Sequence, residues 1–475
     1  MYDKLNDLVL QIDNIVWGVP LIVLLLSLGA FLTFRLKLLQ VFHLPKALKY
    51  MLKDEEGGEG EVSTFGALCT ALSATIGTGN IVGVATAVVA GGPGSLFWMM
   101  VSAFLGMTTK YAEGLLAIKY RTVDEKGHVL GGPFYYIEHG LGKKWKPLAK
   151  MFAFFGMFAG IFGTGTFSQI SGITSSVKAV FDPNSAYMVT IFGRNYSICV
   201  LVTGFLITIA AAMVIIGGLK RISSFSEIVI PFMAITYVGT CLLLLILNYS
   251  EIPNAFVMIF KGAFNPSAVT GGAIGSIIIV AQKGIARGIF SNEAGLGSAP
   301  IAAAAARSNE PVRQGLVSMT GNFFTIIICT MTGLCIVITD AWNVKGLEAA
   351  EITSYAFKSG LPFPAVVSAI ILMLCLSFFA FTTITGWNYY AARCAEYLTN
   401  GNTTFVKVFN GLYIAALFVG PYLTADLLWN SADVFNGLMA LPNLIAIFLL
   451  SGVVVKETNS FFTRLKEKNE SAAAK

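Results

Sequence analysis

Long apolar segments recur along the whole chain, and they constrain its fold more than any other feature. A membrane-spanning α-helix needs about 20 apolar residues, because each residue rises 1.5 Å and the hydrocarbon core is about 30 Å thick. Eleven segments are predicted to span a bilayer: 14–34, 63–90, 94–118, 150–178, 196–217, 226–248, 270–304, 314–339, 362–396, 404–423 and 429–455. No linker separates them, so we predict one all-α polytopic membrane domain over residues 1–475, with 11 transmembrane helices.

The low content of charged residues supports a surface that faces lipid. Only 12% of the 475 residues are charged, whereas a soluble chain carries about 25%. The Lys and Arg residues are scattered among short loops rather than gathered on one face, which argues against a nucleic-acid partner. No metal motif and no nucleophile–base pair is visible, so an enzyme is not expected. The seven Cys residues form no C-x-x-C motif and lie almost entirely in apolar segments, so we predict no structural disulfide.

The distribution of Lys and Arg predicts the orientation. Twenty-three of the 32 fall in loops on one side or in the C-terminal tail, and six fall on the other side. The positive-inside rule then places the N-terminus outside and the C-terminus in the cytoplasm of a cell membrane. The first apolar segment is not followed by a small-residue cleavage site, so we expect a retained helix. Segments 251–265 and 343–360 are too polar to cross and are predicted as short outer helices.

Two runs of glycine and polar residues interrupt the apolar segments. Gly77, Thr78, Gly79 and Asn80 lie near the centre of the second predicted span, and a similar run, 288–297, lies midway along the seventh. Every backbone N–H and C=O in a bilayer needs a partner within the protein, so residues that break a helix at this depth are informative. Glycine also permits close helix packing. For these two runs, however, the added Asn, hydroxyl and carboxylate groups favour discontinuous helices.

The positions of the two interruptions predict an inverted repeat. If segment 14–34 is an extra N-terminal helix, the interrupted spans are the first and sixth of ten, and the repeats are 63–248 and 270–455. Discontinuous helices at corresponding positions indicate a transporter whose site lies at the breaks. Half-helix N-termini suit a carboxylate, whereas unwound carbonyls suit Na⁺ or an ammonium group. A zwitterionic amino acid fits both.

Several long motifs resemble one family of transporters. Residues 91–106, GGPGSLFWMMVSAFLG, are similar to a signature of the alanine or glycine:cation symporters (sodium:alanine symporters), with Met100 where Trp is usual. Segments 77–80, 131–136 and 290–299 also resemble this family. The resemblance covers nearly the whole chain. It implies the leucine-transporter-like fold, with five plus five helices in inverted repeat, and Na⁺-coupled import of a small neutral amino acid, alanine or glycine, by alternating access.

The resemblance also implies roles for individual residues around the substrate. It assigns the turn at residues 77–80 to the substrate carboxylate, chiefly through backbone N–H groups, with a side-chain contact from Asn80. Phe167 is a candidate for the pocket wall, although core packing explains it equally well, and Gln169 is a candidate polar anchor. Phe290 and Ser291 lie at the second break, and Trp387 is expected to cap the apolar side of the pocket. These bulky rings would leave room only for a small side chain.

A sodium site is implied beside the first break. Thr382 and Thr383, with backbone carbonyls near Ser73 and Ile76, would supply the hard oxygen ligands of a co-transported sodium ion. The alternative is that the two hydroxyls bond back to carbonyls of their own helix.

The charged residues within the predicted spans include Lys110, Glu113, Lys283, Arg287 and Glu293. Glu293 would either meet the substrate ammonium or pair with Arg287 as a structural clamp, and we favour the clamp. Lys110 and Glu113, three residues apart, are expected to neutralise each other on one helix face. For Lys283 and Arg287, an outer vestibule and an acidic partner both remain open. A proton-coupled or other cation-coupled transporter of the same fold is the main alternative, but Glu293 alone suits a proton relay.

Overall fold

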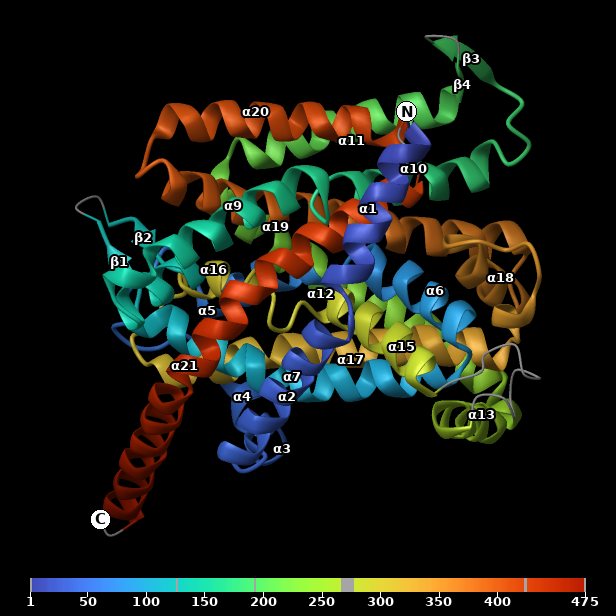
Figure 1. Cartoon of the computed structure of the whole chain (residues 1–475). Coiled ribbons are helices and arrows are strands. Elements are labelled where there is room, and N and C mark those ends of the chain that lie inside the picture. Colours follow the sequence, from blue (N-terminus) through green and yellow to red (C-terminus); the bar gives the residue numbers. More distant parts are fainter. Residues whose placement is uncertain (1, 125–126, 192–193, 266–276, 423–424, 474–475) are drawn as a thin grey trace.

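The structure is a computed structural model that describes residues 2–124, 127–191, 194–265, 277–422 and 425–473. Most of the chain is helical, and long helices run side by side across the molecule (Figure 1). The helices before residue 266 are α1 (Tyr2–Val16), α2 (Val19–Arg35), α3 (Leu39–Phe42), α4 (Leu44–Met51), α5 (Thr64–Thr75), α6 (Val82–Gly91), α7 (Gly94–Lys119), α8 (Pro133–Tyr135), α9 (Lys146–Phe162), α10 (Phe167–Phe181), α11 (Ile198–Ile215), α12 (Gly218–Leu247) and α13 (Ile252–Phe264).

The later part of the chain continues the helical arrangement. Its helices are α15 (Ile277–Asn292), α16 (Ala299–Ala303), α17 (Pro311–Ile338), α18 (Ala350–Gly360), α19 (Ala365–Leu398), α20 (Thr403–Val419) and α21 (Ala425–Ala473). Two small antiparallel hairpins lie in loops: β1 (Thr122–Val123) pairs with β2 (Val129–Leu130), and β3 (Met188–Ile191) pairs with β4 (Arg194–Ser197). The end of the molecule that carries β1 and β2 is called the hairpin end below.

The described helices confirm a polytopic membrane protein. Seven helical segments are long and apolar enough to cross a bilayer, with α9 and α10 counted together as one, or eight if the bent pair α5–α6 counts as one span. Helix α2 is apolar but shorter. The beginning of the predicted span 270–304 lies outside the described residues, because residues 266–276 are not described. Residue 423, the last of the predicted span 404–423, also lies outside them. The number of eleven spans and the inverted repeat therefore stay predictions.

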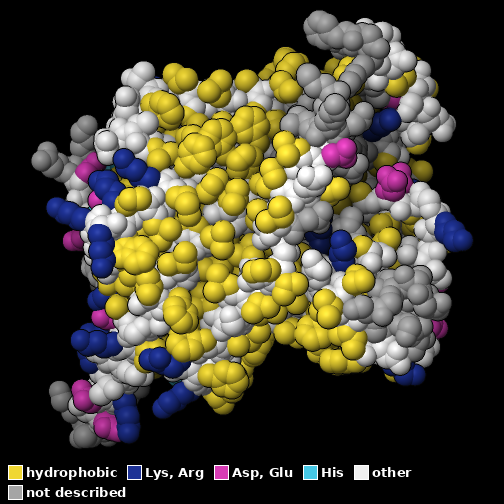
Figure 2. Space-filling model, in the orientation of Figure 1, with side chains coloured by type: hydrophobic (Ala, Val, Ile, Leu, Met, Phe, Trp, Pro, Cys, Tyr) yellow, Lys and Arg dark blue, Asp and Glu magenta, His cyan; other side chains and the backbone are white. Residues whose placement is uncertain are grey.

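The outer surface of the bundle is apolar. Hydrophobic side chains cover most of the face in Figure 2, while many of the Lys and Arg residues in view gather near the hairpin end. Phe205, Ile228 and Ile235 are large side chains on α11 and α12 that remain mostly exposed. Water does not favour such a surface, but lipid tails do, which explains why so little of α11 is buried within the protein.

Two differences from the predicted helices have local causes. Span 150–178 is interrupted, since α9 ends at Phe162 and α10 begins at Phe167. The Tyr413 hydroxyl lies 2.8 Å from the Gly165 carbonyl, so the interruption has a hydrogen-bond partner. The last predicted span ends at residue 455, whereas α21 continues as a helix through the charged tail to Ala473 (Figure 1). The predicted short helix at 251–265 is confirmed as α13, and α18 forms the end of segment 343–360.

Candidate functional site

The first predicted interruption is present in the structure. Helix α5 ends at Thr75, a 3-10 turn covers Thr78–Asn80, and α6 continues at an angle of 66°. The Gly77 N–H donates to the Asn80 Oδ1 atom at 3.0 Å, and the Thr78 N–H donates to Gln169 Oε1 at 3.2 Å. Side-chain amides thus replace the helical hydrogen bonds that the turn gives up, as burial in a membrane protein requires.

The second interruption lies between α15 and α16. Glu293, Gly295 and Gly297 have φ angles of 54°, 87° and 81°, a left-handed conformation that ends α15 and that glycine adopts readily. The Glu293 carboxylate accepts hydrogen bonds from Trp387 Nε1 at 2.8 Å and from the Ser298 hydroxyl at 2.6 Å. Phe290 and Ser291, which were predicted at the break, lie in the last helical turn before it.

The two interruptions face each other. A Cβ atom on Gly79 would lie 3.0 Å from the Phe290 ring, so the backbone of the first break packs directly on the end of α15. Cys329 on α17 joins both breaks, because its sulfur lies 3.4 Å from Asn80 Nδ2 and 3.0 Å from the Ser291 hydroxyl. Sequence reasoning missed Cys329, since a cysteine within an apolar span carries no distinguishing signal.

Two of the predicted sodium ligands lie together. The Thr383 hydroxyl is 3.2 Å from the Ile76 carbonyl, which lies at the C-terminal end of α5. The same hydroxyl lies 3.0 Å from the Phe379 carbonyl. A Cβ atom on Gly77 would come within 2.5 Å of this hydroxyl, so the turn and α19 are in direct contact. Carbonyl and hydroxyl oxygens of this kind are hard ligands that suit Na⁺.

The other two predicted sodium ligands lie on the same pair of helices. The Ser73 hydroxyl donates to the Thr70 carbonyl at 2.7 Å and lies against Gly386, where an added Cβ atom would approach it to 2.5 Å. The Thr382 hydroxyl donates back to the Phe379 carbonyl at 2.9 Å, so both threonine hydroxyls contact a carbonyl of their own helix, as the alternative predicted. Both residues are buried.

Phe167 and Trp387 contact other parts of the protein. Phe167 opens α10, and its ring centroid lies 5.9 Å from that of Phe162. Its ring also packs near Gly420. The Trp387 indole is fully buried and holds Glu293 at the second break. The predicted polar anchor Gln169, by contrast, lies at the first break as expected.

The expected pair between Glu293 and Arg287 was wrong. Arg287 Nη1 instead lies 3.1 Å from Asp433 Oδ2 on α21, whereas Glu293 is bound to Trp387 and Ser298. A separation of six residues places two side chains about 120° apart around a helix, so they point in different directions. The left-handed conformation of Glu293 turns its side chain further away.

Lys110 and Glu113, which were expected to neutralise each other, interact electrostatically but are not in direct contact. The Lys110 ammonium lies 3.5 Å from the Thr75 hydroxyl. Glu113 accepts from the Gly297 N–H at 3.1 Å and from Asn443 Nδ2 at 2.7 Å. The two helix breaks supply the reason. The second break exposes the Gly297 N–H, which needs an acceptor and finds it in Glu113. The first break follows Thr75, whose hydroxyl accepts from the Lys110 ammonium. Each charge therefore supports a different break.

Lys283 and Arg287 face a cavity at the end of the broken span that lies opposite the hairpin end. The cavity has a volume of about 160 Å³. Its charged lining consists of Asp13, Lys283, Arg287 and Asp433, so Arg287 has the acidic partner that one alternative named. The position of this cavity on the outer side of the membrane stays a prediction.

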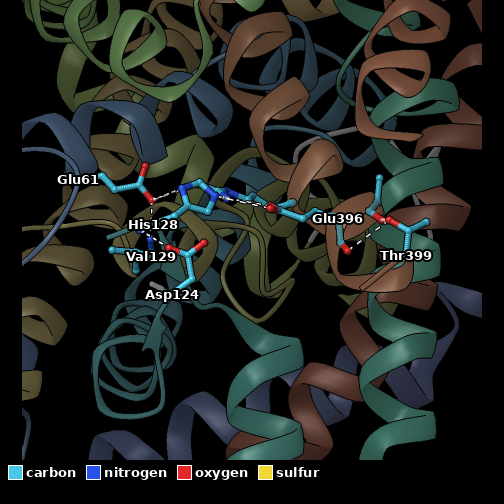
Figure 3. A network of polar contacts seen from close by, with 8 residues as sticks. Glu61, Asp124, His128, Val129, Glu396 and Thr399 are labelled. Carbon is cyan, nitrogen blue, oxygen red and sulfur yellow. Dashed lines mark hydrogen bonds and ion pairs between the residues drawn. The ribbon is translucent and has the colours of Figure 1, made fainter. Parts of the chain in front are cut away.

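A polar cluster closes the hairpin end (Figure 3). His128 Nδ1 lies 3.0 Å from Glu61, and Nε2 lies 3.6 Å from Glu396. Arg393 contacts the same two carboxylates, at 3.3 Å from Glu61 and 2.8 Å from Glu396. The cluster of Glu61, His128, Arg393 and Glu396 connects the segment before α5, the β1–β2 loop and the end of α19.

The charge on His128 predicts a pH-dependent stability. Hydrogen bonds to Glu396 and Glu61 raise the pKa of His128 from 6.5 to about 9, although burial and the Arg393 guanidinium oppose the charge. Because the folded pKa is raised, the stabilisation is complete below pH 6.5 and is lost as the pH rises through about 9. The thermal midpoint of the wild type should therefore exceed that of His128→Gln near neutral pH, and the difference should shrink above pH 9.

The matched control for this experiment is His139→Gln, whose ring packs on Tyr135 outside the cluster. Equal pH profiles for the wild type and His128→Gln would contradict the prediction.

A second connection at the hairpin end joins the two broken spans directly. Val62 and Ala306 form a parallel β-bridge. The Arg121 guanidinium donates to four carbonyl oxygens at 2.7–2.8 Å, those of Glu59, Ala304, Ala306 and Ser308. The segments that enter α5 and leave α16 are therefore held together.

A sequence profile of the Sodium:alanine symporter family matches residues 2–475. The chain belongs to the sodium:alanine symporter family. Its similarity to two full-length relatives agrees with this. The sodium/alanine symporter AgcS of Methanococcus maripaludis is 46% identical, with 96% of this chain and 97% of that protein covered. An uncharacterized transporter of Haemophilus influenzae is 51% identical, with 97% of each chain covered.

A solved structure supports the leucine-transporter-like fold. The crystal structure of MhsT in complex with L-phenylalanine matches with a TM-score of 0.58 at 14% identity, over 85% of this chain and 93% of that one. Family and fold together show a membrane transporter of the sodium:alanine symporter family rather than an enzyme, which confirms the assignment made from the sequence motifs.

Proposed function

We propose that this protein is a Na⁺-coupled symporter that imports alanine or glycine by alternating access. The observation that carries the proposal is the contact between the Ile76 carbonyl and the Thr383 hydroxyl, directly beside the turn at residues 77–80. An ion bound there would neutralise the partial negative charge at the C-terminal end of α5. It would also fix the position of Gly77, and so would couple sodium binding to the substrate turn.

The substrate carboxylate would bind to the turn. In the present structure, amide oxygens of Asn80 and Gln169 accept from the N–H groups of Gly77 and Thr78. A carboxylate offers oxygens of the same kind with a full negative charge, and hydrogen bonds to charged groups are the stronger ones. We therefore assign Gly77, Thr78, Gly79 and Asn80 to the carboxylate and Gln169 to a displaceable anchor.

The remaining assigned residues complete the site. Ser73 and Thr382 would rotate their hydroxyls from local carbonyls toward the ion held by Ile76 and Thr383. The substrate side chain would lie near Phe290 and Ser291, and aromatic residues at positions 167 and 387 would limit its size. Close packing of Gly79 on Phe290 supports a small substrate, since it leaves little space between the breaks.

The proposed architecture has eleven spans, with an extra N-terminal helix at 14–34 and inverted repeats at 63–248 and 270–455. The excess of Lys and Arg at the hairpin end and in the tail supports a cytoplasmic C-terminus and an outer N-terminus in the cell membrane. In this orientation the Arg287–Asp433 pair would close the outer path, and the cluster around His128 would close the inner one.

Uptake by purified protein in liposomes tests the proposal. Radiolabelled alanine and glycine should accumulate when Na⁺ is imposed outside and should not accumulate when Na⁺ is replaced by a large inert cation. The buried carboxylates Glu293 and Glu113 favour proton coupling as the second candidate. Accumulation driven by a proton gradient without Na⁺ would establish that candidate and overturn the first.

Removing the Thr383 hydroxyl should weaken sodium binding. In Thr383→Val, the Na⁺ concentration for half-maximal uptake should rise about 10-fold or more, because a lost polar contact to a charge costs about 1.5–3 kcal/mol. Thr383→Ser should retain most of the affinity. Thr240→Val is the matched control, since its hydroxyl also bonds to the carbonyl four residues earlier. An unchanged Na⁺ dependence in Thr383→Val would place the ion elsewhere.

A further inference from the structure

A second, larger cavity lies at the hairpin end, and the proposed transport cycle does not use it. Its volume is about 400 Å³. Its walls come from the junction of α11 and α12, the last turns of α19 and the first turns of α20. All four helices begin or end here, so the cavity lies where the bundle passes from lipid to water.

Two of the helices around this cavity, α11 and α20, are the least buried of the candidate spans. Only 22% of the apolar stretch of α11 is buried within the protein, and the buried share of the apolar stretch of α20 is the same. The two helices run side by side along one edge of the molecule (Figure 1). Ile216, at the junction itself, is 79% exposed, and Met213 and Val408 beside it are also exposed. The surroundings of the cavity therefore form an apolar surface to which acyl chains can bind.

Two lysines supply the cavity with uncompensated positive charge. Lys220, at the start of α12, and Lys407, in the second turn of α20, are both exposed and line the cavity. Neither forms an ion pair within the described part of the chain. The other charged residues of the lining are Glu61, His128, Arg393 and Glu396, which neutralise one another as described above.

The interior of the cavity is mostly apolar. Ile215, Leu219, Ile222 and Val406 contribute aliphatic surface, and the uncharged polar lining includes two amides. These belong to Asn388 and Asn410, which bond to each other at 3.1 Å. A cationic rim over an apolar interior, between helices at the membrane surface, is the arrangement that binds anionic lipid headgroups. A soluble anion would gain nothing from the aliphatic walls.

We propose that this cavity binds the headgroup of an anionic phospholipid, with its phosphate between Lys220 and Lys407 and its acyl chains along α11 and α20. The bound lipid would hold α20 against the start of α12. One wall of the cavity is the cluster around His128, so the lipid would also contact the element that connects the segment before α5 to α19. The binding itself requires neither sodium nor substrate.

Native mass spectrometry of the full-length protein in detergent tests the proposal. The probes are phosphatidylglycerol and, as a zwitterionic lipid with the same chains, phosphatidylcholine. The wild type should retain phosphatidylglycerol about 30-fold more strongly, as expected for roughly 1 kcal/mol from each of two lysines. Lys220→Gln/Lys407→Gln should lose this preference. Lys143→Gln/Lys144→Gln, which removes two exposed lysines outside the cavity, should retain it.

Competition experiments identify the source of the phosphate group. Inorganic phosphate and glycerol phosphate, at concentrations well above that of the lipid, should fail to displace phosphatidylglycerol if the apolar walls contribute. Displacement by either soluble anion would overturn the lipid assignment. Equal retention of the two lipids by the wild type, or retention of the preference by Lys220→Gln/Lys407→Gln, would overturn the site. Unchanged thermal midpoints of both double variants would show that they remain folded.

Discussion

Gly77→Ala should reduce sodium-driven uptake to less than about 1% of the wild-type rate. A Cβ atom at this position would lie 2.5 Å from the Thr383 hydroxyl and 3.1 Å from Gln169 Oε1. Both separations are shorter than van der Waals contact, so the hydroxyl must leave the Ile76 carbonyl and the amide must leave the Thr78 N–H. Loss of two or more such contacts at about 1.5–3 kcal/mol each accounts for the size of the effect.

Gly83→Ala is the matched control for this substitution. Gly83 lies in α6, a few residues beyond the turn, and no atom lies within 4 Å of a Cβ atom added there. Alanine favours the helix by about 1 kcal/mol over glycine, so this variant should fold and transport normally. Initial uptake rates in liposomes, with thermal midpoints for both variants, provide the measurement. Normal uptake by Gly77→Ala would mean that the ion and the substrate bind away from this turn.

Glu293→Gln is expected to destabilise the protein strongly. Glu293 is buried, and its backbone ends α15 in a left-handed conformation. Its carboxylate accepts hydrogen bonds from Trp387 and Ser298. Lys110 is also buried, and Glu293 and Glu113 are the carboxylates that interact with it electrostatically. Neutralising Glu293 leaves the ammonium with less compensation, which costs about 3–5 kcal/mol in buried pairs. A lower thermal midpoint in detergent and loss of uptake should follow.

A double variant separates this charge effect from simple loss of a hydrogen bond. Lys110→Met removes the ammonium, so Glu293→Gln/Lys110→Met should recover much of the stability that Glu293→Gln alone loses. Glu251→Gln is a control at an exposed position. If the destabilisation of the double variant equals the sum of the destabilisations of the two single variants, Lys110 and Glu293 are not coupled. The electrostatic explanation then fails.

Local chemistry made both helix interruptions predictable. A run of glycine, hydroxyl and amide residues inside an apolar segment needs partners within the protein, and the structure supplies them at Gly77, Thr78 and Glu293. The contact between Ile76 and Thr383 followed from the family resemblance and is present. Roles in sodium and substrate binding remain proposals for the experiments above.

The partners of buried charges were not predictable in the same way. Asp433 lies 146 positions after Arg287, and no periodicity within either segment indicates that α15 and α21 meet there. Glu113 and Asn443 are likewise distant in sequence. Lys110 and Glu113 interact electrostatically as their helical spacing predicted, but their hydrogen bonds go to the two breaks instead. Spacing determines which side chains share a face, but not which of several partners a charge selects.

The bridge between Val62 and Ala306 has a consequence for synthesis of the chain. Its two residues are 244 positions apart, so the ribosome must translate both broken spans before this contact can form. Until then, the four carbonyl oxygens that accept from the Arg121 guanidinium cannot all be in place around it. The first broken span therefore enters the bilayer as an incomplete element. Truncation before residue 304 should expose it to membrane quality-control proteases, whereas truncation within the charged tail should not.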